Sequence, residues 1–352
     1  MCGFTGVVFS GEQIRDQFPF DLEQFRTAAS RIAYRGDTDH QEYINNAMWL
    51  SHYRLAFQDI EAGIQPMLSH DGKHIIVFNG EVYNHLEIRK NILKKSGIEF
   101  KTRSDTETIL EGWKVCGETF FQEFDGEYAF VIIDIKTNSL IAHRDRHGVK
   151  PLFLRLPGIN TREFSIYKDS YNFKVNYLEF GSEIKAMPGS KIWQHDGLLR
   201  QFVGLYEPIC TPFENIIHLP PGSVLTTVRN ESGFQCQLVT NNEPIRTHGN
   251  TAVTSEEEFE EVFRGAVANR LLSDVELGVY LSGGVDSKSI AYELAKARKD
   301  SGIVKSFTVG FSHESYDETA EALRFTKHIG FKSHVLRVDS EALNYSYPIA
   351  LQ

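Results

Sequence analysis

The sequence predicts a two-part chain, with an α+β first half followed by an α/β second half built on a parallel sheet. At 352 residues the chain is long for one compact core, and typical domain sizes suggest two domains. Predicted strands and helices come in pairs in the first half, whereas single strands alternate with single helices beyond residue 254. Between them, residues 241–254 are rich in Asn, Thr, Gly and Pro, which is typical of a linker. We therefore expect domains over residues 2–240 and 255–352.

The composition is that of an ordinary soluble globular protein. Lys and Arg number 37 against 47 Asp and Glu, so the formal net charge is -10, and small metabolites are better candidate partners than nucleic acid or anionic membranes. The four cysteines form no C-x-x-C pair and no metal-ligand spacing, which indicates a reducing compartment. We find no secretory signal pattern and no membrane-length apolar run, and we expect a cytoplasmic location.

The first half opens with an apolar strand at residues 4–9. Apolar side chains over residues 20–34 repeat at the spacing of one helical face, and an Arg35-Gly36-Asp37 turn ends this helix. Buried strands are expected at residues 47–50 and 74–78. The start of this half is therefore predicted as a strand, a helix and two further strands.

The segments after these two strands are predicted to be connections. Residues 51–56 have no clear period, so they are expected to be irregular, and Asn79-Gly80-Glu81 is expected to be a turn. The other elements of this half are helices at 84–96 and 105–115, each followed by glycine, a hairpin of strands at 128–135 and 140–144, a long surface excursion at 156–177, a strand at 178–182, and a turn at Pro220-Pro221-Gly222.

The period of the apolar residues changes beyond the linker. Ser255 followed by Glu258 matches a capping box, and a helix with apolar positions as far as Leu271 follows. The next elements are a strand at 276–281, a Gly-rich turn, a helix to 299, a strand at 305–311, a helix ended by Gly330 and a strand at 332–339. This alternation predicts a parallel sheet with right-handed crossovers.

The most specific motif is Ser282-Gly283-Gly284-Val285-Asp286-Ser287, between a predicted strand and a predicted helix. Two glycines let the backbone turn tightly with converging N–H groups, and the helix N-terminus adds positive potential, so the turn can hold an anion. A mere turn would explain the glycines but not the serines and the aspartate. The motif is neither the G-x-x-x-x-G-K-[ST] loop nor a G-x-G-x-x-G fingerprint. We expect its ligand at the carboxyl ends of the strands.

Cys2 carries a thiol that its own α-amine could activate if Met1 is removed. Reference pKa values are about 8.5 for a thiol and about 7.7 to 8.0 for an α-amine, so near neutral pH the amine can take the proton of the thiol. Taken alone, a cysteine directly after the initiator methionine is more simply explained as a residue without a function. Only the rest of the sequence can give it a role.

Two family resemblances supply that context. The Ser282–Ser287 motif resembles the pyrophosphate-binding loop of the ATP pyrophosphatase family, whose members activate a carboxyl or carbonyl oxygen as an adenylate. The first half resembles the four-layer (αββα) glutaminase domain of the class II, N-terminal nucleophile amidotransferases. In this order the halves are similar to the glutamine-hydrolysing asparagine synthetase family. Matching segments occur in order at residues 1–3, 35–36, 54–55, 79–84, 104–105, 125–126, 144–146, 148, 150–152, 182–186 and 221–222.

The resemblance implies a glutaminase site in the first half. Cys2 would attack the side-chain amide of glutamine, with its own α-amine as general base, and form a glutamyl thioester and ammonia. The other implied residues are Asn79 and the Gly80 N–H for the oxyanion hole, Arg54 for the α-carboxylate of glutamine, and Glu81 and Asp105 for its α-ammonium. Simpler explanations are a surface ion pair for Arg54, a hairpin turn for Asn79-Gly80 and a helix N-terminal residue for Asp105.

In the second half the resemblance implies ATP and Mg²⁺ as cofactors. The implied residues are Ser282, Gly283, Gly284 and Ser287 for the β,γ-pyrophosphate, Asp286 for Mg²⁺, and Leu281 and Val309 for the adenosine part. Val309 is equally well explained as a core residue. Asp317-Glu318 resembles an acidic turn of the family and equally fits a helix N-cap.

Three departures from the family pattern bear on these expectations. Asp37 stands where the family usually has proline. Lys288 stands where a small hydroxyl residue is usual, and its cation could assist the polyphosphate. The sequence ends at Gln352, before the later acidic glycine loop and the helices that shape the aspartate pocket. We therefore expect an incomplete synthetase domain with an uncovered apolar face, which favours a homodimer or a partner chain.

Four functions remain open on this reading. The chain could be an asparagine synthetase whose missing part another chain supplies, or an amidotransferase for another carboxylate, such as a sugar acid or peptide. It could also be a stand-alone glutaminase, or a non-catalytic partner subunit of a split synthetase. The intact glutaminase residues speak against the last. We expect the isolated chain to hydrolyse glutamine but not to make asparagine unaided.

Overall fold

The computed structural model describes residues 1–11, 22–189, 191–204, 208–240, 253–298, 304–313, 315 and 317–350. It divides into two compact units, Met1–Arg246 and Thr247–Gln352. Most of the expected linker at 241–254, and the first residues of the expected helix at 20–34, lie outside the described residues.

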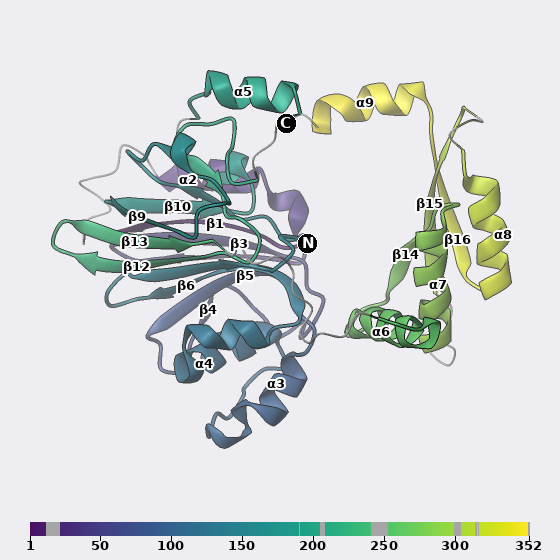
Figure 1. Cartoon of the computed structure of the whole chain (residues 1–352), viewed down its shortest axis with the longest axis horizontal. Coiled ribbons are helices and arrows are strands. Elements are labelled where there is room, and N and C mark those ends of the chain that lie inside the picture. The colour runs from purple at the N-terminus through teal and green to yellow at the C-terminus, as the bar shows by residue number, and fades with distance from the viewer. Residues whose placement is uncertain are drawn as a thin grey trace. The chain divides into compact units, whose positions relative to one another are not determined.

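Two antiparallel sheets form the centre of the first unit (Figure 1). One contains, in spatial order, β11 (Ile216–His218), β8 (Phe153–Arg155), β10 (Tyr177–Gly181), β1 (Gly3–Phe9), β3 (Met48–Arg54) and β2 (Asp39–Ile44). The other contains β4 (Met67–Leu68), β5 (His74–Val82), β6 (Gly126–Asp134), β7 (Leu140–Arg144), β12 (Val224–Asn230), β13 (Gly233–Val239) and β9 (Ser170–Val175).

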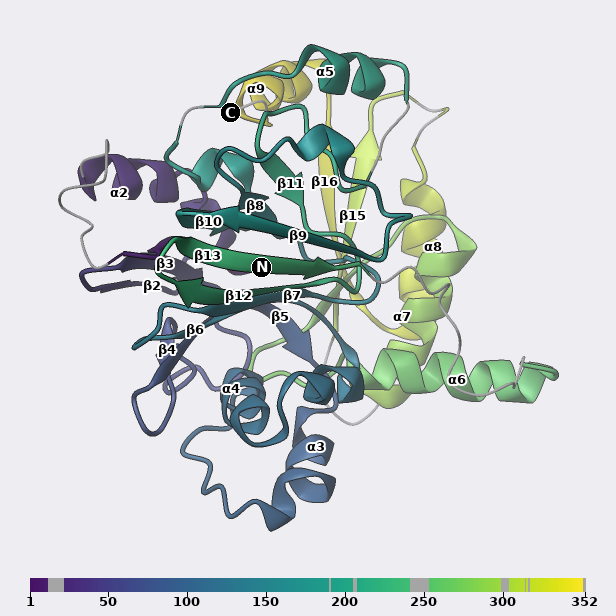
Figure 2. The same ribbon diagram turned by 60° about the vertical axis from the view of Figure 1, so that its left-hand side comes forward.

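Helices cover the outer faces of both sheets (Figures 1 and 2). On one side lie α3 (His85–Asn91) and α4 (Asp105–Cys116), and on the other lie α2 (Leu22–Ser30) and α5 (His195–Phe202). Short 3-10 turns stand at Ala33–Arg35, Leu93–Lys95, Glu118–Glu123, Thr161–Glu163 and Ile184–Ala186.

The alternation of side chains along the strands divides the core into three layers of contacts. Phe4 of β1 and Val77 of β5 pack between the sheets. On its other face, β5 packs against α4 through Ile76. In the same way, β1 packs against α2 through Val7. Three apolar interfaces therefore separate helix, sheet, sheet and helix, which confirms the expected αββα fold.

Two polar segments that the sequence analysis expected to be connections are strands. The irregular stretch predicted at 51–56 is wrong for its first four residues, because β3 continues to Arg54 and pairs with both β1 and β2. The turn predicted at Asn79-Gly80-Glu81 is also wrong, because β5 continues to Val82 opposite β6. The hairpin-turn explanation for Asn79-Gly80 is thereby excluded. Backbone pairing on one or both sides holds these polar segments in the sheets.

The predicted surface excursion at 156–177 is partly wrong as well. Residues 170–175 form β9, which pairs with β13, and Tyr171 and Val175 pack into the core between the sheets. The sequence analysis did not anticipate the strands β11, β12 and β13. By contrast, α4 begins at Asp105 as predicted, and Gly97 and Gly117 follow their helical segments with φ angles of 73°.

Gly80 is required by the close approach of β5 and β6. Its φ is 147°, and a Cβ atom there would lie 2.1 Å from the carbonyl oxygen of Glu127 and 2.6 Å from Cα of Tyr128. Since both obstacles are backbone atoms, we expect Gly80→Ala to lower the free energy of unfolding by about 3 kcal/mol in urea denaturation. Gly72 is a matched control, because its φ is also positive but no neighbour lies near its Cβ position. Equal losses for the two alanine variants would contradict this explanation.

The second unit is built on a parallel sheet in the order β14 (Gly278–Tyr280), β15 (Lys305–Phe311) and β16 (Lys332–Val338). The intervening helices are α7 (Val285–Ala297) and α8 (Thr319–Ile329), so the predicted strand-helix alternation is confirmed. α6 (Glu256–Asn269) precedes the sheet, and α9 (Ser340–Ala350), which was not anticipated, follows it. Among the described residues, no helix combines the length and apolar character needed to cross a membrane.

The two faces of this sheet differ in what covers them. Leu281 packs with Ala291 of α7 and Ala322 of α8 on one face. On the other face, β15 exposes Phe307, Val309 and Phe311 among the described residues. Val309 is 46% exposed, so its explanation as a core residue is wrong.

Candidate active site

Four expected site residues lie on the inner faces of the two stacked sheets. They continue, at intervals of two residues, the inward-facing series that contains Phe4 in β1, Leu50 in β3 and Val77 in β5. These residues are Cys2, Arg54, Asn79 and Glu81. The charges of Arg54 and Glu81 both act on the Cys2 thiol, so the strands bring the expected groups to one place.

The Cys2 thiol is half-buried and contacts the backbone that follows β3. The Leu55 N–H donates to Cys2 Sγ at 3.4 Å, and Sγ lies 3.7 Å from the Leu55 carbonyl oxygen. Burial raises the pKa of the thiol above its ordinary value. Since the thiolate is the nucleophilic form, the thiol needs a base close to it before it can react.

Arg35 fixes the backbone beside Cys2. Its Nε donates to the Cys2 carbonyl oxygen at 3.0 Å, and its Nη1 donates to Glu183 Oε1 at 2.7 Å. The Tyr34 hydroxyl donates to the same carboxylate. A Cβ atom on Gly3 would lie 2.9 Å from Cδ of Arg35, so this position favours glycine. Arg35 was not among the predicted site residues. The family matches at residues 35–36 and 182–186 were the sequence signals that could have indicated a role for it.

Arg54 is buried and organises the loop that follows β3. Its Nη1 donates to the Ile60 carbonyl oxygen at 2.7 Å, and its Nη2 donates to those of Asp59 at 2.7 Å and Gln58 at 3.1 Å. The surface ion pair considered for this residue is therefore wrong, because Arg54 is only 5% exposed and binds backbone oxygens. Its fixed positive charge remains next to Cys2.

Glu81, which is half-buried, and Asp105, which is buried, form a pair of interacting carboxyl groups. The Val82 N–H donates to Asp105 Oδ2 at 3.0 Å, and the Gln58 side-chain amide donates to Glu81 Oε2. Burial raises the pKa of both carboxyl groups, and the charge of Asp105 raises that of Glu81 further. A cation between them would offset this repulsion, so the pair is suited to bind an ammonium group. Asp105 also begins α4, so its helix-terminal explanation holds as well.

Asn79 presents a buried hydrogen-bond donor that has no partner among the described residues. The residue is 1% exposed, and its Nδ2 meets no acceptor in that part of the chain. A buried polar group without a partner is unfavourable, and an oxygen atom of a bound molecule would relieve it. From the inner face of the second sheet, opposite the sheet that carries Cys2, this amide can stabilise an oxygen that becomes negative when the thiol attacks a carbonyl.

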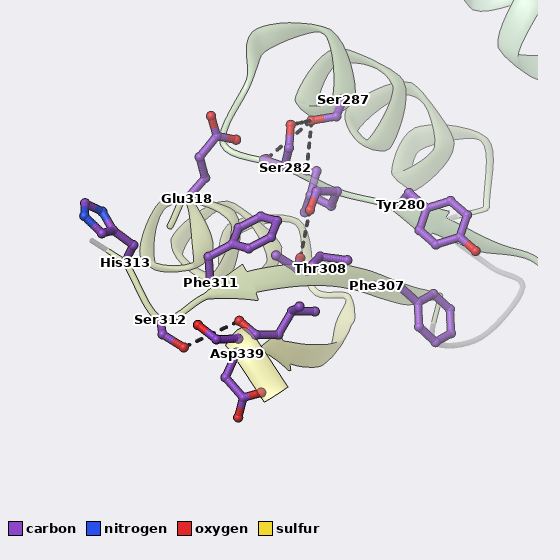
Figure 3. A pocket seen from close by; sticks show the side chains of 14 residues that line it. Tyr280, Ser282, Ser287, Phe307, Thr308, Phe311, Ser312, His313, Glu318 and Asp339 are labelled. Atoms are coloured by element: carbon purple, nitrogen blue, oxygen red, sulfur yellow. Dashed lines mark hydrogen bonds between the residues drawn. The ribbon is translucent and has the colours of Figure 1, made fainter. Parts of the chain in front are cut away.

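The second unit has a cleft of about 890 Å³ at the carboxyl ends of its strands (Figure 3). Ser282 and Ser287 line it, and their Oγ atoms lie 2.9 Å apart. Leu281 and Val309 also line this cleft, while Gly283 and Gly284 form the turn after Ser282 and Asp286 lies in the first turn of α7. The expected ATP residues therefore meet at one edge of the sheet, where the parallel fold predicts a ligand.

The glycine-rich loop already binds one anionic oxygen of the protein. The Gly283 N–H donates to Glu318 Oε2 at 2.8 Å, and the Gly284 N–H donates to Ser282 Oγ at 3.1 Å. Lys288 instead pairs with Glu321 of α8, with Nζ 2.6 Å from Oε1. Among the described residues, no three His, Cys, Asp or Glu side chains are grouped to hold a metal ion. The loop thus has donors for a phosphate group, and Asp286 contributes a single exposed carboxylate.

Comparison with known proteins agrees with this arrangement. Residues 1–237 match the family described as glutamine amidotransferase domain, and residues 258–350 match the family described as asparagine synthase. The chain belongs to the glutamine amidotransferase domain family. The matched residues include Cys2, Arg54, Asn79, Glu81 and Asp105.

Proteins similar to this chain include several asparagine synthetases. A probable glutamine-hydrolysing asparagine synthetase of Dictyostelium discoideum is 30% identical over 298 residues, covering 83% of this chain and 45% of that protein. Asparagine synthetase 3 of Bacillus subtilis is 31% identical over 334 residues, covering 92% and 50%. Amidase chyE of Penicillium rubens is 29% identical over 369 residues, covering 97% and 52%. The chain spans about half the length of these curated relatives.

Proposed function

We propose that the chain is a glutamine-dependent amidotransferase of the asparagine synthetase type. Cys2 would hydrolyse glutamine to glutamate and ammonia, and the ammonia would amidate a carboxylate, aspartate being the first candidate. The observation that supports this proposal most is the buried amide of Asn79, whose Nδ2 has no partner among the described residues and which lies on the inner face of the second sheet, while Cys2 lies on the inner face of the first. Acyl transfer through an oxyanion requires a nucleophile and a hydrogen-bond donor that is free to bind the developing negative oxygen.

The first half-reaction would begin with removal of Met1, which gives Cys2 a free α-amine. The amine takes the thiol proton, and Sγ attacks the side-chain carbonyl carbon of glutamine. Asn79 Nδ2 and the Gly80 N–H stabilise the resulting oxyanion. The protonated amine then returns its proton to the leaving nitrogen, ammonia departs, and water hydrolyses the thioester to glutamate. Burial raises the pKa of the thiol, so this base is needed even at neutral pH.

Recognition of glutamine would use the charged groups around Cys2. Glu81 and Asp105 would hold the α-ammonium between them, because a cation there offsets the repulsion between the two carboxylates and stabilises their charged forms. Arg54 would provide the positive charge for the α-carboxylate, while its Nη atoms hold the loop that contains Gln58 and Asp59.

The residues of the second unit fit a nucleotide with Mg²⁺. The contact of the Gly283 N–H with a carboxylate oxygen supports a phosphate at this loop, with Ser282 and Ser287 as further donors. Asp286 would hold Mg²⁺, which commonly uses one or two carboxylates together with phosphate oxygens. Bound ATP would supply the chemical activation that makes a carboxylate carbon open to attack by ammonia. Leu281 and Val309 would contact the adenosine part.

A second candidate is an amidotransferase that uses a different carboxylate. It is favoured by the similarity to amidase chyE, which covers 97% of this chain. The two candidates share the glutaminase reaction and differ only in the acceptor.

Glutamate release and amide formation can be measured separately. We expect the chain to release glutamate from glutamine without ATP, and we expect its mass to show that Met1 is absent. Pyrophosphate formation from ATP with added ammonia then tests the second unit, with aspartate and other carboxylates compared as acceptors. Preference for another carboxylate would favour the second candidate. A chain that retains Cys2 without Met1 and releases no glutamate would contradict the proposal.

A further inference from the structure

Gln58 connects the glutamine site with a buried histidine. Its side-chain Nε2 donates to Glu81 Oε2, and its Oε1 accepts a hydrogen bond from His85 Nε2 at 3.0 Å. Its backbone oxygen accepts from Arg54 Nη2 at 3.1 Å. Gln58 therefore contacts Glu81, which we propose binds the α-ammonium of glutamine, and Arg54, which we propose binds its α-carboxylate.

The orientation of the Gln58 amide, with Nε2 toward Glu81 and Oε1 toward His85, indicates which ring nitrogen of His85 carries the proton. Burial lowers the pKa of His85 to about 4, so the ring is neutral near pH 7 and carries one N–H. The amide oxygen of Gln58 can only accept, so this arrangement places the histidine proton on Nε2. The NH₂ group of Gln58 then points to Glu81 before any substrate binds.

Glu81 lies among charges that oppose its ionisation. The charge of Asp105, which begins α4, raises the pKa of Glu81, whereas Glu127, directly opposite in β6, is paired with Lys150 at 3.4 Å. Lys150 provides a compensating positive charge, and Cys2 is the other titratable group that interacts with Glu81. A hydrogen-bond donor aimed at the Glu81 carboxylate favours its charged form. The Gln58 amide meets this need.

We propose that Gln58 is a positioning residue that selects substrates with an α-amino group, by orienting the Glu81 carboxylate toward the α-ammonium. The inference rests on the proposed function, because it identifies how that same site recognises one end of glutamine. Gln58 lies in the loop held by Arg54, so the same loop couples recognition of the ammonium end to recognition of the carboxylate end.

The test compares glutamine with glutaramate, which keeps the amide and one carboxylate but has no α-amino group. In Gln58→Met, a side chain of similar length loses both hydrogen bonds. We expect the ratio of kcat/KM for glutamine to that for glutaramate to fall about tenfold, through a higher KM for glutamine. The acid limb of kcat/KM for glutamine should move to higher pH, because Glu81 without its donor holds its proton more tightly.

A matched variant and a second perturbation separate this role from a general loss of structure. Gln41→Met changes an exposed glutamine whose amide contacts Asp39, and we expect it to leave the ratio unchanged. His85→Phe removes the group that orients the Gln58 amide, so the ratio should fall there too, by a smaller factor.

Several results would overturn the inference. Equal losses for both substrates in Gln58→Met would indicate a structural role, and a lower KM for glutamine would mean that the amide competes with the ammonium. An unchanged ratio in an active Gln58→Met enzyme would refute the inference alone. Absence of glutamate release by the unsubstituted chain would refute the proposed function, and the inference with it.

Discussion

Cys2→Ala is expected to reduce glutamate release from glutamine to the background rate, a loss on the order of 1000-fold or more. Alanine removes Sγ, the only atom that we propose forms a bond with the substrate. The Cys2 carbonyl oxygen, which accepts from Arg35, is unchanged, so the chain end should keep its position. The measurement is glutamate release at saturating glutamine.

Cys116→Ala is the matched control for this loss. Cys116 ends α4 and packs on the helix side of the second sheet, away from the inner faces. We expect it to keep the full rate. Glutamine should still raise the melting temperature of Cys2→Ala, because the proposed binding groups remain. Equal rates of glutamate release by Cys2→Ala and the unsubstituted chain would contradict the assignment of the nucleophile.

Apolar periodicity predicted the parts of the fold that burial alone determines. The hairpin of β6 and β7, the start of α4 and the strand-helix alternation of the second unit all follow from it. Apolar periodicity gave a wrong prediction at the ends of β3 and β5, where the expected site residues lie. Arg54 ends β3, and Asn79 and Glu81 lie in β5, yet these polar residues read as connections because ladder pairing, rather than apolar burial, holds them in the sheet.

The sequence indicated which residues form the site but not which contacts hold those residues in place. The resemblance supplied Cys2 and the residues proposed around it, because those lie in short ordered motifs. The contacts that hold them join segments far apart, such as Arg35 with the Cys2 carbonyl and Glu318 with the Gly283 N–H. A single sequence carries no signal for such pairings, so the support around the site became visible only in the folded chain.

Asn79→Ala is expected to lower kcat for glutamine hydrolysis by about 100- to 1000-fold, with a much smaller change in KM. The amide would bind the oxygen mainly when it becomes negative in the transition state, so its loss affects the chemical step more than substrate binding. Its Nδ2 has no partner among the described residues of the free protein. The substitution therefore breaks no side-chain hydrogen bond of that amide nitrogen, and the melting temperature should change little.

Asn84 provides the opposite case with the same side chain. Its Nδ2 donates to the Glu123 carbonyl oxygen at 2.8 Å, and its Oδ1 accepts from the Asp125 N–H at 3.0 Å. Asn84→Ala should therefore lower the melting temperature and leave kcat nearly unchanged. A stability loss without a kcat loss in Asn79→Ala would show that this amide supports the fold. An activity loss in Asn79→Ala alone would mean that its missing partner is the oxygen of the reacting amide.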